Sequence, residues 1–410
     1  MRLPLAAMRA EVREIGRPRL FFLSSVTLGH VVVHWYVGLL SLVLPSLKEK
    51  FGLTDVQVGG ITTAQMGVTG AGTLPAGYLA DSYRRHSALI LAGAIATFGL
   101  GYLVIGSANS YALVLLGAGL IGWGIALWHP CAMGGLSIQF PTRRGLALSV
   151  HGVGASVGDA LSPIIVGAVI GVISWQVTLQ FHLIPALLIA LFLWRGLGPT
   201  TFGDGLKPTL RSYLTGLRTM VANRQVLAVM FANALTNMSR LSILTFLPIY
   251  LQEHLGYSSF ILGVYLTLLY VMGIVSQPIM GIVSDRIGRK AIMLPAFALM
   301  GLLYIALVYS PGGVLLGLVI AALGLFFYAI LNITQTAVMD VSEERVQAST
   351  MGVMGLFSQP FTLSAPIVAG FLVEQYDIKA AFWFAAVTAL LASAVLVPVR
   401  FRKVQASSGT

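Results

Sequence analysis

Twelve long apolar segments determine what this 410-residue chain can fold into. Each has about 20 residues or more, which is the length that an α-helix needs to cross the hydrocarbon core of a lipid bilayer. The segments are too long and too continuously apolar to be strands of a membrane barrel. The sequence therefore predicts an all-α membrane protein with twelve transmembrane helices. We expect these helices at residues 20–44, 56–80, 87–107, 110–133, 145–171, 174–196, 226–252, 258–281, 290–309, 312–338, 348–373 and 379–399.

A polar segment separates the predicted helices into two sets of six. Residues 197–224 combine glycine, proline, threonine and aspartate with several basic side chains. Clusters of this composition between periodic segments are typical of loops and linkers. We therefore expect five regions, which are a basic tail at 1–19, a six-helix bundle at 20–196, a linker at 197–224, a second six-helix bundle at 225–400 and a short tail at 401–410.

The net charge of +11 indicates membrane topology rather than binding to nucleic acid. Of the 25 lysines and arginines, 21 lie in the termini or in alternate loops, and the intervening loops contain only Lys48, Lys50 and Lys379. Loops rich in lysine and arginine remain on the cytoplasmic side of a membrane, so both termini are predicted to be cytoplasmic. We expect a multi-pass protein of a bacterial inner (plasma) membrane that contacts anionic lipid and binds no nucleic acid.

A short charged motif occurs once in each half of the chain. The second copy reads Gly281-Ile-Val-Ser-Asp285-Arg286-Ile-Gly288-Arg289-Lys290. A looser copy, 204 residues earlier, reads Gly77-Tyr-Leu-Ala-Asp81-Ser82-Tyr-Arg84-Arg85-His86. Both copies lie between two apolar segments. A repeat at about half the length of the chain predicts two halves built on one plan.

Two six-helix halves with the same loop chemistry resemble the major facilitator superfamily. The second copy of the motif matches the loop signature of that family, Gly-x-x-x-Asp-(Arg/Lys)-x-Gly-Arg-(Arg/Lys), at every position. The first copy keeps Gly77, Asp81 and Arg85, but it departs from the signature at Ser82, Arg84 and His86. The resemblance covers residues 20–400. It implies a transporter that works by alternating access, with the first, fourth, seventh and tenth helices lining a central cavity.

A narrower resemblance is found in the first half. The segments Leu28-Gly29-His30, Leu44–Thr54 and Trp128-His129-Pro130 are similar to the fosmidomycin-resistance-like drug exporters. The motif loops lie at the cytoplasmic edge, where we expect their charged groups to latch the two halves together in the outward-facing state. The expected gating residues are Gly77, Asp81, Arg85, Gly281, Asp285, Arg286, Gly288, Arg289 and Lys290.

Histidines are concentrated in the first half. His30 and His34 share one face of the first predicted helix, His129 precedes Pro130 in the fourth, and His151 begins the fifth. This arrangement fits side chains that bind an anion, that carry a proton, that bond a neighbouring helix or that ligate a metal. No second histidine pair or cysteine completes a ligand set in the sequence, so no metal site is predicted. We expect His30, His34 and His129 to bind substrate and His151 to take part in proton coupling.

Asp159 lies in the middle of the fifth predicted helix. A carboxylate at that depth in a membrane costs a few kcal/mol unless it is paired or protonated. We expect Asp159 to carry the coupling proton, and the alternative is one half of a buried structural pair. The glycines of this helix, such as Gly154 and Gly158, allow close packing on a neighbour.

Arg240 is the strongest indication of function. It lies near the middle of the seventh predicted helix, and Asn233, Asn237 and Arg240 form one polar stripe at positions i, i+4 and i+7. The guanidinium group stays charged and matches the geometry of carboxylate and phosphate-like groups. We expect Arg240 to bind the negative group of the substrate, and the alternative is a fixed ion pair with Asp159. Asn332 and Gln335 add polar groups from the tenth helix.

These observations predict a monomeric secondary transporter that exports a small anionic or amphiphilic organic compound by proton antiport. It would need no cofactor besides the proton gradient. An importer of an organic acid and an exporter of a metal ion or metal chelate are alternatives from the same class. A non-transporting receptor and a lipid-flipping protein are alternatives from another class. An enzyme is not predicted, because the chain has a single His-x-x-x-His pattern and no Walker loop.

Overall fold

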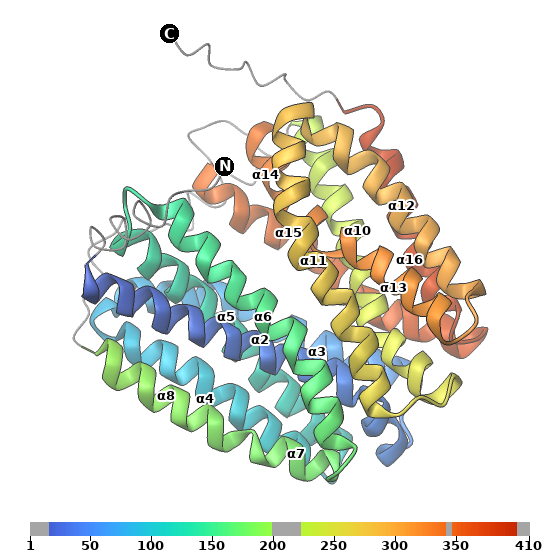
Figure 1. The fold of residues 1–410 in the computed structure, drawn as a ribbon, viewed down its shortest axis with the longest axis horizontal. Coiled ribbons are helices and arrows are strands. Elements are labelled where there is room, and N and C mark those ends of the chain that lie inside the picture. Colours follow the sequence, from blue (N-terminus) through green and yellow to red (C-terminus); the bar gives the residue numbers. More distant parts are fainter. Residues whose placement is uncertain (1–15, 199–222, 342–346, 400–410) are drawn as a thin grey trace.

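The computed structural model describes residues 16–198, 223–341 and 347–399. The predicted tail at 401–410 and most of the predicted tail at 1–19 and linker at 197–224 lie outside these ranges. The described chain consists of helices joined by short loops, and Figure 1 shows them as two groups, one coloured blue to green and the other yellow to red. The predicted all-α membrane fold is confirmed.

The first half contains α2 (Arg17–Phe51), α3 (Asp55–Ser82), the short helix η1 (Arg84–His86), α4 (Ser87–Gly106), α5 (Tyr111–Gln139), α6 (Arg144–Ile170), α7 (Trp175–Phe181) and α8 (Leu183–Leu197). The second half contains α10 (Arg224–Ile249), the π-helical turn η2 (Tyr250–His254), α11 (Ser259–Ile287), α12 (Arg289–Tyr309), α13 (Val314–Phe327), α14 (Ala329–Val341), α15 (Gln347–Gln375) and α16 (Ala380–Leu396).

Ten helical segments of the described chain are long and apolar enough to cross a membrane. Three of the expected spans consist of two pieces each, because α7 is followed directly by α8, α10 by η2, and α13 by α14. Two of the twelve expected spans, α3 and α16, are not among these ten segments. Helix α16 has only 17 residues. Helix α3 is less apolar because it faces the other half of the protein: Thr63 Oγ1 donates to the carbonyl of Leu363 at 3.0 Å.

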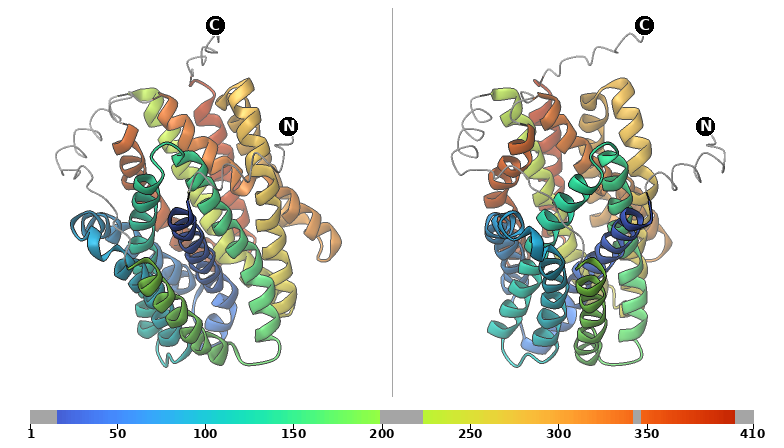
Figure 2. Two further views of the ribbon diagram at one scale, coloured as in Figure 1. Left: turned by 60° about the vertical axis from the view of Figure 1, so that its left-hand side comes forward. Right: turned by 90° about the vertical axis from the view of Figure 1, so that its left-hand side faces the viewer.

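Four glycines bring the two halves into backbone contact. A Cβ atom at Gly263 of α11 would lie 2.2 Å from the carbonyl oxygen of Pro163 on α6, and a Cβ atom at Gly59 of α3 would lie 2.2 Å from that of Pro366 on α15. Figures 1 and 2 show α6 (green) running beside α11 (yellow). Two reciprocal contacts complete the set, in which Gly167 packs on Ser259 and Gly370 packs on Asp55. Each helix of a pair therefore both supplies and receives a glycine.

A tight turn between α2 and α3 positions charged groups at the end of this interface. Gly52 ends α2 in the left-handed conformation, with φ 59°, which glycine adopts without steric cost. Thr54 and Gln57 then form a capping box, in which each side chain accepts from the backbone N–H of the other. The turn holds Lys48 beside Asp55, with Nζ 2.8 Å from Oδ1.

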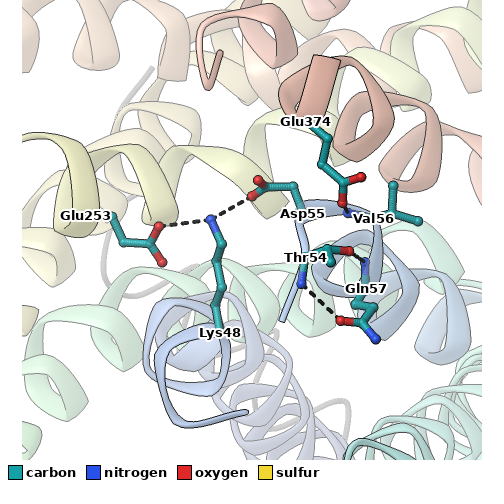
Figure 3. A network of polar contacts seen from close by, with 7 residues as sticks. All are labelled: Lys48, Thr54, Asp55, Val56, Gln57, Glu253 and Glu374. Carbon is teal, nitrogen blue, oxygen red and sulfur yellow. Dashed lines mark hydrogen bonds and ion pairs between the residues drawn. The ribbon is translucent and has the colours of Figure 1, made fainter. Parts of the chain in front are cut away.

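We call the charged group at this end the clasp; it consists of Lys48, Asp55, Glu253 and Glu374 (Figure 3). Lys48 Nζ also lies 2.9 Å from Oε2 of Glu253, which belongs to the second half. Glu374, from the same half, accepts from the backbone N–H of Val56 at 2.8 Å. The carboxylate of Glu374 thus lies at the N-terminus of α3, where the helix dipole favours a negative charge. Two carboxylates of the second half hold the first half at the clasp end.

Replacing Lys48 with glutamine should weaken closure at the clasp end. Of the two ion pairs of Lys48, only the one with Glu253 joins the two halves, and a partly exposed pair of this kind contributes about 0.2–1 kcal/mol. We expect its loss to shift the closed-to-open equilibrium by up to about fivefold. Spin labels on Val172→Cys and Val314→Cys, which are exposed residues of the two halves, report the separation in a Cys131→Ser background. The label-to-label distance distribution should gain a longer component.

Lys50→Gln is the matched control. Lys50 lies half a turn away, and its Nζ donates to the carbonyl of Ala108 at 2.9 Å, within its own half. Its replacement should leave the distance distribution as in the parent protein. Equal distributions for Lys48→Gln and Lys50→Gln would show that the clasp contributes nothing to closure.

Candidate functional site

Close packing of α6 on α2 positions the carboxylate of Asp159. A Cβ atom at Gly158 would lie 2.3 Å from the carbonyl oxygen of Val31, and one at Gly154 would lie 2.6 Å from that of Thr27. Residues 154–158 also have the Gly-x-Ser-x-Gly spacing of a hydrolase nucleophile elbow, but they lie inside a helix rather than at a strand-to-helix turn. Their glycines serve helix packing.

Asp159 is buried beside His34. Its Oδ1 lies 3.0 Å from Nδ1 of His34, and the two side chains are 11% and 22% exposed. The alternative that Asp159 forms a fixed ion pair with Arg240 is therefore not realised in this structure. The predicted proton carrier has a histidine partner within its own half.

The four histidines expected in the site come together. We call His30, His34, His129 and His151 the histidine cluster. The ring of His30 lies at its centre, with centroid distances of 4.7 Å to His34, 5.4 Å to His129 and 3.8 Å to His151, on which it is stacked. Trp128, fully buried, lies parallel to His30 at 6.5 Å. Sequence reasoning missed this tryptophan, although it adjoins His129 and packs on Gly29.

Arg240 is buried in the second half, with 8% of its surface exposed. Its guanidinium carbon lies 4.5 Å from the ring centroid of Phe327 and 4.6 Å from that of Tyr328. Such cation–π contacts stabilise a charge by roughly 0.5–2 kcal/mol. Among the described residues the guanidinium makes no ion pair, and its Nε atom is buried without a hydrogen-bond partner. The positive charge is held by aromatic rings alone and has no counter-ion within the described chain.

Aromatic residues that sequence reasoning missed surround this charge. Tyr328 lies between α13 and α14, and its ring centroid is 5.5 Å from that of Tyr270 on α11. Asp159 of the first half and Arg240 of the second half both lie near this tyrosine pair. The run Phe326-Phe327-Tyr328 was the available signal in the sequence.

The predicted polar residues of the seventh and tenth helices differ in burial and in hydrogen bonding. Asn233 is buried, and its amide donates to Ser358 Oγ at 3.2 Å within the second half. Asn332 is exposed and donates to Oε1 of Gln277 at 2.9 Å, so Gln277 joins the polar patch of the tenth helix. The two remaining predicted residues, Asn237 and Gln335, are half-buried. Sequence reasoning missed Gln277 because it lies on α11.

The two copies of the motif lie at the end opposite the clasp, and each copy contains one ion pair within its own half. Asp81 pairs with Arg84, at 2.8 Å between Oδ1 and Nη2, so the residue that departs from the family signature provides the partner. Asp285 pairs with Arg289, and Lys290 donates to carbonyl oxygens near the end of α16. The remaining predicted gating residues are two exposed arginines and three glycines, which are Arg85, Arg286, Gly77, Gly281 and Gly288. Gly288 has a positive φ of 96°, which ends α11.

The chain forms two helical halves that meet around buried polar groups, and each half carries one copy of a charged loop. These are the features of a membrane transporter. The chain matches the sequence model of the Major Facilitator Superfamily over residues 26–361 and 229–410, and it belongs to this family. It is a multi-pass membrane transporter and not an enzyme, as the sequence predicted.

Two relatives show which members of the family the chain is similar to in sequence. The chain is 26% identical to the fosmidomycin resistance protein of Escherichia coli (strain K12) over 295 residues, which cover 71% of each chain. It is 23% identical to the probable nitrate transporter NarT of Staphylococcus aureus (strain MRSA252) over 284 residues, 68% of this chain and 70% of the relative. The first likeness agrees with the subfamily resemblance found in the sequence.

Solved structures show the same fold. A bacterial homologue of the human lysosomal transporter Spinster, in an inward-facing and unoccupied conformation, superposes with a TM-score of 0.74 at 17% identity, and the match covers 95% of this chain and 99% of that one. The nucleoside transporter NupG superposes with a TM-score of 0.78 at 14% identity, covering 92% and 99%.

Proposed function

We propose that the protein exports a small anionic or amphiphilic organic compound in exchange for protons. The observation that carries this proposal is Arg240, a buried cation with aromatic neighbours and no described counter-ion. A charged group held inside a membrane protein is costly unless it is paired, and it marks a substrate or ion pathway by default. A carboxylate or phosphate-like group of the substrate would supply the missing charge with a forked hydrogen-bond geometry.

The surroundings of Arg240 suit a substrate with an apolar body. Phe327 and Tyr328 present ring faces beside the guanidinium group, and Tyr270 extends the aromatic surface. Pockets of this kind bind the apolar part of a ligand, while a few polar groups fix its orientation. The cluster residues His30, His34 and His129, with Asn237, Asn332 and Gln335, would supply further polar contacts.

Asp159 and His34 are the groups that we assign to proton exchange, with His151 nearby. The next residue along α6, Ala160, accepts a hydrogen bond from Thr267 of the second half at 2.8 Å. A proton taken up at Asp159 would therefore change the charge directly beside the contact between the halves. Rocking of the halves about this site would expose it to each side in turn.

We place the motif end at the cytoplasm, because the basic loops are expected there, and we propose a monomer in a bacterial inner membrane with its basic loops against anionic lipid. The clasp end is then outward. In this orientation the clasp holds the outer side closed, and the motif charges would latch the inner side after the halves rock.

Transport driven by a pH gradient tests the proposal. Sealed vesicles containing the purified protein are given an imposed pH gradient, and the fluxes of an aromatic carboxylate and of its neutral amide are followed. Only the carboxylate should move, and collapse of the gradient should stop its accumulation. Asp159→Asn should lower gradient-driven transport at least about tenfold, because the carboxylate that binds the proton is gone. Full gradient-driven transport by Asp159→Asn would remove Asp159 from the coupling step.

Import of an organic anion is the second candidate, and it uses the same Arg240 site. One relative is named as a probable nitrate transporter, and nitrate is an anion. The two directions predict opposite responses in the same vesicles. Accumulation on the side with the higher proton concentration indicates antiport, whereas accumulation on the other side indicates transport together with protons.

A further inference from the structure

Three histidines of the cluster use the same ring nitrogen for a hydrogen bond. Nδ1 of His30 and Nδ1 of His129 each donate to a backbone carbonyl oxygen, at 2.8 and 3.0 Å. Nδ1 of His34 donates to the carboxylate of Asp159 at 3.0 Å. A neutral imidazole with its proton on Nδ1 has a lone pair on Nε2. All three rings are thus fixed as the tautomer that leaves Nε2 free to bind a ligand.

The three rings bring ring nitrogens close together, and their Nε2 atoms have no hydrogen-bond donor in the described part of the chain. Each of His30, His34 and His129 offers a ring nitrogen within 4.8 Å of those of the other two. Nε2 of His30, a residue that is 6% exposed, is buried with no hydrogen-bond partner. No hydrogen bond to Nε2 of His34 or His129 is present in the described part of the chain. An unpaired buried acceptor such as Nε2 of His30 costs about 1–3 kcal/mol, so the arrangement favours a ligand that accepts this lone pair together with those of the two partly exposed rings.

We propose that His30, His34 and His129 bind one divalent transition-metal ion such as Zn²⁺. Metal-ligating histidines almost always donate their other ring N–H to a carboxylate or a backbone carbonyl, and all three rings do so here. Three protein nitrogens with an open fourth position are the ligand set of an accessible zinc site. Zn–N distances of about 2.0–2.1 Å require the nitrogens to approach one another by rotation of the rings.

The site is partly open to solvent. Metal binding there goes beyond the function proposed above. His34 and His129 are partly exposed, whereas His30 is buried. The open position would accept water or a donor atom of the transported compound. Arg240 needs no metal to bind an organic anion, so absence of metal binding would leave the proposed anion site in place.

Metal titration of the full-length protein tests the inference. Tag-free protein in detergent is stripped with a chelator, then titrated with Zn²⁺ by calorimetry and with Co²⁺ by visible absorption. We expect one ion per chain and the intense absorption of four-coordinate Co²⁺. His34→Gln and His129→Gln should each weaken binding by at least the 10–100-fold that loss of an outer-shell partner costs, and the double variant should not bind.

His254→Gln is the matched control, since His254 lies in η2 at the clasp end, where it stacks on Tyr250 at 5.3 Å. Its affinity should equal that of the parent protein. Binding by the double variant with unchanged affinity, or an equal loss in His254→Gln, would overturn the inference. If a glutamine variant does not fold, the parent protein alone decides, because absence of stoichiometric binding or the weak absorption of six-coordinate Co²⁺ excludes a three-histidine site.

Discussion

Arg240→Gln is expected to abolish transport of anionic compounds while leaving the protein folded. Loss of one partner from a buried, hydrogen-bonded charge pair costs about 2–5 kcal/mol, which corresponds to roughly 30-fold or more in affinity. In the protein without substrate, the same substitution should raise the free energy of unfolding. The described chain gives Arg240 no counter-ion to lose, and removing a buried unpaired charge relieves its desolvation cost.

Two measurements separate a binding role from a structural one. The first is the thermal unfolding temperature with and without an aromatic carboxylate, since a ligand stabilises the folded state that binds it. The ligand should raise this temperature in the parent protein but not in Arg240→Gln. The second is carboxylate flux in vesicles, with Arg195→Gln as control because Arg195 is exposed at the end of α8. A variant Arg240→Gln that transports the carboxylate with unchanged kinetics would refute the anion site.

Gly263→Val is expected to stop transport by preventing closure at the clasp end. The new Cβ atom would lie 2.2 Å from the carbonyl oxygen of Pro163 and 2.8 Å from its carbonyl carbon. Both are backbone atoms of a helix and cannot move aside as a flexible side chain would, so α6 and α11 must separate. Overpacking a tight contact costs about 1–3 kcal/mol or more, and here opening of the interface relieves it.

The labels at Val172→Cys and Val314→Cys should therefore report a permanently longer distance, with vesicle transport reduced to background. Gly93→Val is the matched control, because a Cβ atom at Gly93 of α4 meets nothing within 4 Å. It should change neither readout. A Gly263→Val protein with normal transport and the parental distance distribution would show that the close approach of α6 and α11 is dispensable.

The fold could be predicted from the sequence because the bilayer imposes a length and a hydropathy on every helix that crosses it. The burial of Arg240 and Asp159 followed from the same argument, since each is a single charge inside a long apolar segment. The hydropathy pattern gave a weaker signal for α3, whose polar residues face the second half.

The contacts of the site could not be predicted, because they depend on helix packing over long sequence separations. The pairing of Asp159 with His34 requires α6 to lie on α2, and the approach of His129 to His30 requires α5 to join them. Helical periodicity places residues on faces but does not say which faces meet. The pairing of Asp81 with Arg84 is local, yet the family signature pointed to Arg85.

The reciprocal glycine contacts between the halves have a consequence for the origin of the chain. Gly59 and Gly263 are 204 positions apart, as the two motif copies are, and their partners Pro366 and Pro163 are 203 apart. The interface is thus self-complementary, as in a two-fold symmetric dimer. An ancestral six-helix chain could have paired with a second copy of itself through this contact.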